Sequence, residues 1–181
     1  MNITEAREFA RGKCEKDTTY RHLVSVEGVM RALSRRFGED EETWALTGLF
    51  HDLDQDITDS DPSRHALLAA EWLREVGVDE LVVNGVLAHN FEENRTDLMS
   101  KAIVHADAVA GLLVAAALVR PEKSAGMKVS SVRKKLKEKA FAPGVNRDEI
   151  NDVEDSIGLS VEDLIALGIE GLQQVATEID L

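Results

Sequence analysis

The chain has 181 residues, of which 44% are hydrophobic and 30% charged, a composition typical of one globular domain with its own core. Its formal net charge of −13 argues against an extended surface for nucleic acid or anionic membranes, because phosphate groups would be repelled at long range. A single cysteine, Cys14, cannot form an internal disulfide.

Neither the N-terminal residues nor the longest apolar run predicts a membrane segment. Residues 1–16 are polar and lack the apolar centre of a signal peptide. The longest apolar run, 108–119, is shorter than the roughly 20 residues that a membrane helix needs. We therefore expect a cytoplasmic protein with no membrane partner.

Apolar residues recur at helical spacing along nearly the whole chain, and no stretch alternates long enough to predict a strand. Helices are expected at about 4–12, at 17–37, and from about Asp40 to a C-terminal end that carries His51 and Asp52. Asp61 followed by Pro62 predicts the start of the next helix, since aspartate caps a helix and proline fits its first turn.

That helix carries His65 and ends at Gly77. Asp79 caps a shorter helix that ends with His89 and Asn90, and residues 91–97 form a polar connection.

The second half of the chain begins with an almost uniformly apolar helix at 98–119, which belongs at the centre of a bundle. Residues 128–139 hold six basic residues and one acidic residue, which indicates a solvated amphipathic face more than a phosphate site. Asn146 and Ser160 begin the last two helices.

These patterns predict an all-α, single-domain helical bundle of about eight helices over residues 1–181. Its core would be about 17–119, with C-terminal helices at about 128–181 packed on it.

Four of the five histidines lie on different predicted helices, on or near the apolar face of each. One histidine on such a face is usually a hydrogen-bonded core residue. Several neutral imidazoles crowded into one core beside an aspartate favour a divalent cation instead. The four are His22, His51, His65 and His89.

Asp107 lies in the apolar run AIVHADAVAGLL, where an ionised carboxylate costs several kcal/mol or more unless it is paired. A metal ion, a helix terminus or an arginine would each remove that cost, and the nearby histidines favour the metal. His105 lies two positions earlier, about 200° around the helix, so both residues cannot face one metal. We interpret His105 as structural, or as a residue that supports a metal ligand without binding the ion itself.

The order His22, His51-Asp52, Asp107 resembles the H…HD…D motif of HD-domain metal-dependent phosphohydrolases. The resemblance covers nearly the whole chain, and the tail resembles that of compact, stand-alone HDIG-type hydrolases. The segments that carry it are YRHLVSVEGVMRAL, LTGLFHDLD, SRHALLAAEWLREVG, VLAHN, IVHADAVAGL and ALVRPEKSAGMKVSSVRKKLKEKAFAPGVNRDEI.

The resemblance implies that His22, His51, Asp52 and Asp107 hold one divalent metal ion. His65 and His89 match histidines that bind a second metal in some members of the family, with Asp52 bridging the two. Two elements depart from the pattern: HDIG reads His-Asp-Leu-Asp here, and a frequent His-His pair reads His89-Asn90. The second departure leaves one histidine fewer for a second metal.

The expected activity is hydrolysis of a nucleotide or another small phosphorylated compound, as a phosphomonoesterase or phosphodiesterase, through metal-activated water. Mn²⁺, Fe²⁺, Co²⁺, Ni²⁺, Zn²⁺ and Mg²⁺ all suit such ligands. Asp52, Asp54 and Asp56 are candidate catalytic residues, the last two as a base or to orient the attacking water. Candidate phosphate-binding residues, beside the motif residues in sequence, are Arg21, Arg64 and Lys101.

Two other functions remain open at this point. HD-fold proteins with additional histidines at the positions of His65 and His89 include di-iron oxygenases. A metal-stabilised regulatory module without activity is the other alternative, and a homo-oligomer is compatible with either.

Overall fold

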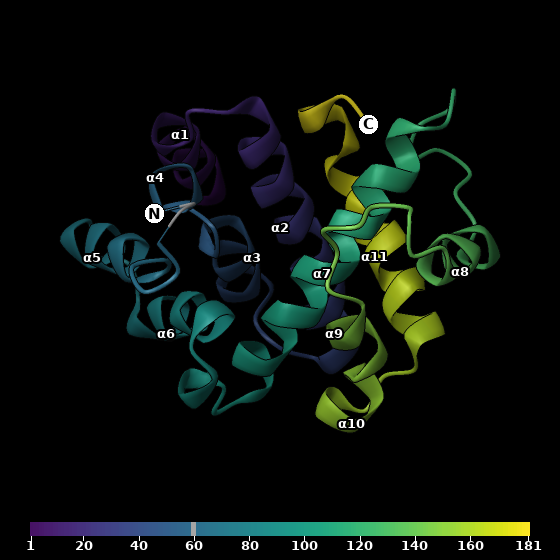
Figure 1. Ribbon diagram of the computed structural model, residues 1–181. Coiled ribbons are helices and arrows are strands. Elements are labelled where there is room, and N and C mark those ends of the chain that lie inside the picture. The colour runs from purple at the N-terminus through teal and green to yellow at the C-terminus, as the bar shows by residue number, and fades with distance from the viewer. Residues whose placement is uncertain (59–60) are drawn as a thin grey trace.

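A computed structural model describes residues 1–58 and 61–181, and these are helical throughout, with no strand (Figure 1). The all-α prediction is therefore confirmed. Eight α-helices have nine residues or more, in agreement with the predicted number. The helices are α1 (Ile3–Lys13), α2 (Asp17–Phe37), α3 (Glu41–Phe50), α4 (Gln55–Thr58), α5 (Leu67–Glu75), α6 (Glu80–Asn90), α7 (Leu98–Leu118), α8 (Val129–Lys137), α9 (Arg147–Asn151), α10 (Val153–Ile157) and α11 (Val161–Val175), with 3-10 turns at η1 (Glu92–Asn94) and η2 (Ala176–Ile179).

The two longest helices, α2 and α7, form the centre of the bundle. Helix α2 packs against α3, α7 and α11, and α7 also packs against α6, α8 and α9. In Figure 1, α7 crosses the middle of the molecule between α3 and α6 on one side and α11 on the other. Residues more than eighty positions apart in the sequence thereby meet along the α2–α7 contact.

Local signals place the ends of these helices. Gly38 ends α2 with φ at +73°, a left-handed conformation that glycine adopts at little cost. The Asp40 carboxylate accepts a hydrogen bond from the backbone N–H of Thr43 and begins α3. Asp97 begins α7 through a capping box with Ser100. The positions of α2, α3 and α7 are thus encoded locally.

Helix α3 approaches α2 closely because Gly48 has no side chain. A Cβ atom at this position would lie 2.8 Å from the carbonyl oxygen of Val26 and 2.9 Å from the backbone nitrogen of Glu27. Gly28 and Gly171 allow a similarly close contact between α2 and α11. The close α2–α3 contact sets the separation of the histidines that these two helices carry.

The predicted helix start at Asp61-Pro62 is wrong. Residues 62–66 form turns, and α5 begins only at Leu67. The Asp61 carboxylate accepts hydrogen bonds from the backbone and hydroxyl of Ser63 instead. Ala66, with φ at +67°, precedes α5 and gives it no side-chain cap. The start of α5 depends on a tertiary contact, described below.

Among the described residues, α7 alone is long and apolar enough to cross a membrane. Within its most apolar 18-residue window, 67% of the residues are buried inside the bundle. The core helix of a soluble protein has the same length and composition.

Candidate metal centre

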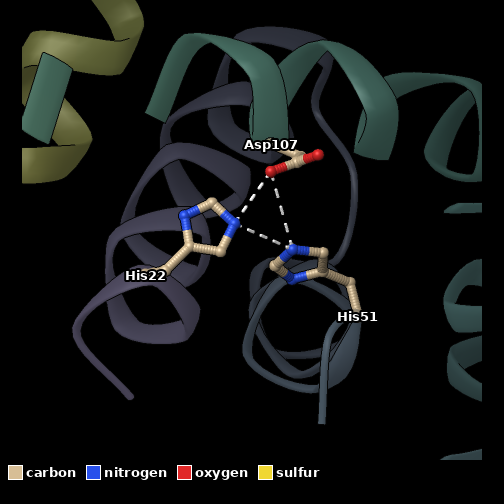
Figure 2. A group of neighbouring side chains, drawn as sticks. All are labelled: His22, His51 and Asp107. Atoms are coloured by element: carbon tan, nitrogen blue, oxygen red, sulfur yellow. Dashed lines mark hydrogen bonds and ion pairs between the residues drawn. The ribbon is translucent and has the colours of Figure 1, made fainter. Parts of the chain in front are cut away.

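Three side chains from distant parts of the sequence meet at the α2–α7 contact (Figure 2). His22 projects from α2, His51 follows the last residue of α3, and Asp107 lies in the middle of α7. The Nε2 atom of His22 lies 2.8 Å from Asp107 Oδ1 and 3.2 Å from Nε2 of His51. The Nε2 atom of His51 lies 3.7 Å from the same Asp107 oxygen. Three ligand atoms therefore converge on one point.

The His51 ring is fixed by the backbone of its own helix. Its Nδ1 donates a hydrogen bond to the carbonyl oxygen of Gly48 at 2.8 Å, and the side chain is fully buried. With the proton on Nδ1, the Nε2 lone pair faces His22 and Asp107. Metal-binding histidines are commonly oriented by such a second hydrogen bond.

The two carboxylate oxygens of Asp52 face different sets of histidines. Its Oδ2 lies 3.6 Å from Nε2 of His51 and 3.9 Å from Nε2 of His22. Its Oδ1 lies 3.0 Å from Nε2 of His65 and 3.1 Å from Nε2 of His89. Asp52 therefore lies between two groups of nitrogen ligands, as a carboxylate shared by two sites would.

Two buried atoms in the cluster, Asp52 Oδ1 and His89 Nδ1, form no hydrogen bond with the described residues. The Nε2 atoms of His65 and His89 lie close to Asp52 Oδ1, but neither contact has the geometry of a hydrogen bond. Unpaired polar atoms are costly in a protein interior, whereas imidazole nitrogens and carboxylate oxygens together suit a divalent cation. The residues present thus fit a metal ion.

The electrostatics of the cluster also favour a cation. Burial raises the pKa of the Asp107 carboxyl, but the neighbouring imidazoles, His22 foremost, outweigh it and bring that pKa below its ordinary value. For Asp52, burial is likewise outweighed by the neighbouring imidazoles of His51 and His89, and its pKa lies well below the usual range. Both carboxylates are therefore ionised at neutral pH, and together they give the site two negative charges.

Asp54 holds His65 in place. His65 Nδ1 lies 2.9 Å from Asp54 Oδ1, while the other Asp54 oxygen accepts a hydrogen bond from the backbone N–H of Ala69 at 3.0 Å. Asp54 thus supplies the N-terminal cap that α5 lacks locally. Its carboxylate is fully buried and makes these contacts, which give Asp54 a positioning role. That Asp54 also acts as a base or orients the attacking water stays a prediction.

His65 lies between two carboxylates. Burial lowers its pKa, but the neighbouring carboxylates of Asp52 and Asp54 raise it more strongly, to about 10. In this arrangement the ring joins the two aspartates, and its Nε2 faces the same Asp52 oxygen as His89 does.

Asn90 occupies the position where the resemblance led us to expect a second histidine. Its side-chain amide donates to the backbone carbonyls of Pro62 and His65, at 3.0 and 3.1 Å. Asn90 therefore holds the turn that carries His65 and has a structural role at this position.

Asp56 belongs to another part of the molecule's polar network. Its Oδ2 accepts hydrogen bonds from the backbone of Glu15 and Lys16, and its Oδ1 accepts one from the Thr19 hydroxyl. Asp56 thus fastens the connection between α1 and α2. This geometry gives no support to the prediction that Asp56 is a catalytic base.

None of the three predicted phosphate-binding residues contacts the cluster. Arg21 donates from Nε to the carbonyl oxygen of Ile179 at 3.2 Å, near the C-terminus. The Arg64 and Lys101 side chains are exposed and form no hydrogen bond or ion pair with residues 1–58 or 61–181. Phosphate binding by these residues stays a prediction.

A cleft of about 390 Å³ opens directly beside His22 and Asp107. One wall is the small-residue face of α7, at Ala108 and Gly111, and the opposite wall is the loop between α8 and α9. The loop residues that line it are Ala142, Gly144, Val145 and Asn146. A substrate bound in this cleft would lie against the candidate metal ligands.

Arg147 holds the loop that forms this wall, a role that the sequence did not reveal. Its guanidinium donates hydrogen bonds to five backbone carbonyl oxygens, which is the full donor capacity of an arginine. The acceptors are the carbonyls of Leu136 (3.0 Å), Glu138 (3.2 Å), Phe141 (2.5 Å), Ala142 (3.2 Å) and Val145 (3.2 Å). The hydrogen bonds of the Arg147 side chain therefore hold the loop that forms this wall of the cleft.

Comparison with known proteins relates the chain to several bacterial ribonucleases. It is 27% identical over 90 residues to Ribonuclease Y 2 of Levilactobacillus brevis, which are 50% of this chain and 17% of that protein. It is 25% identical over 92 residues to Ribonuclease Y of Geobacter sulfurreducens, 51% of this chain and 18% of that protein. The chain thus spans less than a fifth of these relatives. No solved structure matches it.

The profile of the HD domain family matches residues 19–119, a segment that begins just before His22 and ends after Asp107. The matched segment contains every side chain of the histidine–aspartate cluster: His22, His51, Asp52, His65, His89 and Asp107. This match covers more than half of the chain, and the chain therefore belongs to the HD domain family.

Proposed function

We propose that this chain is a metal-dependent phosphohydrolase that acts on a nucleotide or another small phosphorylated compound. Membership of the HD domain family supports a metal-dependent hydrolase. The observation that carries the proposal is the convergence of His22, His51 and Asp107 beside an open cleft, with Asp52 facing both groups of histidines.

His22, His51, Asp52 and Asp107 would hold the divalent ion. An ion there would lower the pKa of bound water towards neutrality and polarise a phosphoryl oxygen. His65 and His89, with Oδ1 of Asp52, offer a second ligand group on the far side of the same carboxylate. The cleft wall held by Arg147 would position the rest of the substrate against this centre.

The substrate proposal covers both monoesters and diesters. The relatives named ribonucleases support a phosphodiester substrate, while the net charge of −13 favours a short substrate over a long polyanion. Candidate substrates are therefore nucleoside monophosphates, cyclic nucleotides and short oligoribonucleotides.

The test is a screen for phosphate release and for diester cleavage over these candidates, with the metal content of the purified protein measured in parallel. We expect activity with Mn²⁺ or another divalent ion, and a loss of at least 10³-fold in Asp52→Ala. Asp148→Asn, an exposed charge removal on α9, is the matched control and should retain full activity. No activity over the whole panel, with metal bound and the fold stable, would overturn the proposal.

A second candidate function is an iron-dependent oxygenase, favoured by the two ligand groups that share Asp52. Oxygen consumption by the iron-loaded protein, in the absence of any phosphate release, would support it over hydrolysis.

A further inference from the structure

The cleft beside His22 and Asp107 is lined, apart from those two side chains, by small and uncharged residues. Four of the eight lining residues are alanine or glycine, and among the described residues no lysine or arginine lines it. Its volume of about 390 Å³ lies within the range of roughly 300–1,000 Å³ that small-molecule sites occupy. The cleft thus has room for a small organic group but offers it no positive charge.

The basic side chains nearest in sequence are engaged elsewhere. Arg147 donates to five carbonyl oxygens around the loop, so its guanidinium has no donor left for a ligand. Lys134 and Lys137 on α8 line a separate hollow that shares no residue with the cleft. Several phosphate groups bound in the cleft would therefore meet the Asp107 carboxylate without a compensating cation. The wall chemistry favours a ligand body without charge.

Asn146 provides one directed hydrogen-bond donor in this cleft. Its Oδ1 caps α9 by accepting from the backbone N–H of Asp148 at 3.2 Å and of Glu149 at 3.5 Å. These two donors determine which end of the amide is the oxygen. The Nδ2 group forms no hydrogen bond with residues 1–58 or 61–181. An oriented amide N–H₂ group is therefore available to an acceptor atom of a ligand.

The two walls of the cleft are fixed to each other. His105 Nδ1 on α7 donates to the carbonyl oxygen of Glu149 on α9 at 2.5 Å. A Cβ atom at Gly111 on α7 would lie 3.4 Å from Cγ2 of Val145 on the loop, and no other atom comes as close. The width of the cleft between these residues therefore depends on the missing side chain at Gly111. Walls fixed before binding reduce the entropic cost of taking up a ligand.

We propose, on the basis of the proposed function, that this cleft binds the nucleoside of a mononucleotide and that the Asn146 amide donates to an acceptor on its base. A nucleobase has apolar faces and a polar edge, which match walls of small side chains with a single donor. A sugar alone would present hydroxyl groups on all sides. The substrates would then be nucleoside monophosphates or cyclic mononucleotides, in preference to nucleoside triphosphates and oligonucleotides.

The first experiment measures binding without turnover, with the metal-free protein and the four common ribonucleosides. We expect at least one nucleoside to shift the backbone amide signals of Gly111, Gly144 and Val145 in NMR spectra. Gly111→Leu should fill the cleft and weaken this binding by at least about tenfold, with a smaller loss in Gly111→Ala. Gly12→Leu is the matched control, because a Cβ at Gly12 meets nothing within 4 Å, and it should bind as the wild type does.

The second experiment measures turnover with Mn²⁺. Asn146→Ser keeps a capping oxygen for α9 but loses the amide donor. We expect it to raise KM for the matching nucleoside monophosphate by about tenfold, the loss of one hydrogen bond to a partly buried acceptor. Turnover of ethyl phosphate, which has no base, should be unchanged. Asn2→Ser is the control, since Asn2 caps α1 in the same way. The matching nucleoside triphosphate should bind at least about tenfold more weakly than the monophosphate.

Three results would overturn the assignment of the cleft: no shift of its amide signals with any nucleoside, equal binding by Gly111→Leu and the wild type, or tighter binding of the triphosphate than of the monophosphate. Turnover of ethyl phosphate would then leave the hydrolase proposal standing. Nucleoside binding without hydrolysis of any phosphate ester would instead overturn the proposed function and support the cleft as a nucleoside site.

Discussion

At the scale of single residues, three aspartates at alternate positions have three different roles. Asp52 faces the histidine cluster, Asp54 holds His65 and caps α5, and Asp56 fastens the α1–α2 connection. Sequence reasoning grouped them as neighbouring acids, because spacing alone does not show which backbone amides lie near each carboxylate. Only the role of Asp52 next to His51 was predictable from the motif.

Asp54→Asn tests the positioning of His65. The amide cannot act as a charged partner for Nδ1, so the ring should become less well oriented towards Asp52. Loss of a residue that orients a metal-binding histidine typically costs about 10–100-fold in metal affinity, and we expect a loss in this range for the weaker of two metal-binding steps. Calorimetric titration with Mn²⁺ measures it. Asp56→Asn is the control, and unchanged metal binding by Asp54→Asn would contradict the assignment.

Asp56 should contribute to the acid sensitivity of the fold. Burial raises its pKa, but hydrogen bonds from Thr19, Lys16 and Glu15 lower it below the ordinary value of about 3.9. The folded protein therefore binds fewer protons than the unfolded chain, and this stabilisation is complete above about pH 5 and lost as the pH falls through 3.9 towards the folded pKa. Urea unfolding between pH 3 and 7 should show a shallower pH dependence in Asp56→Asn. An identical slope would exclude this contribution.

At the scale of helices, close contacts set the geometry of the site. Gly48 lets α3 approach α2, and the Gly48 carbonyl also fixes the His51 ring. The stripe of apolar residues on α2 and the stop at Gly38 made the bounds of this helix predictable. The start of α5 was not predictable, because its cap comes from Asp54, which precedes Ala69 by fifteen residues.

Gly48→Ala should separate α2 from α3. The new methyl group would meet backbone atoms of Val26 and Glu27, which cannot rotate away. We expect a loss of about 1–3 kcal/mol in the free energy of unfolding, together with weaker metal binding as His51 moves from His22. Gly12→Ala is the control, since a methyl group there meets nothing within 4 Å. Equal stability of the two variants would contradict a close α2–α3 contact.

Arg147→Lys should loosen the wall of the cleft. A lysine ammonium offers three donors in place of the five that hold the loop. The amide protons of Phe141 and Val145, which bond within the loop, should exchange with deuterium faster. Arg133→Lys is the control, because the Arg133 side chain forms a surface ion pair with Glu162. Unchanged exchange over residues 138–146 would show that Arg147 does not organise the loop.

At the scale of the whole molecule, the fold brings two distant segments together across α2 and α7. Periodicity predicted a helical bundle because helices buried on one face carry their apolar residues at regular spacing. The clustering of the candidate metal ligands was predictable for a related reason: histidines and an aspartate on apolar faces need partners. The role of Arg147 was not predictable, since a charge at the start of a short polar helix resembles an ordinary solvated group until the fold brings the loop carbonyls around it.

We propose that His22, His51, Asp52 and Asp107 together hold one divalent ion. Anomalous diffraction from crystals grown with Mn²⁺ or Zn²⁺ tests it most directly. We predict one strong peak at about 2.0–2.2 Å from Nε2 of both histidines and from Oδ2 of Asp52 and Oδ1 of Asp107, which is lost in Asp107→Asn. A wild-type structure at saturating metal with no peak among these four side chains would contradict the account.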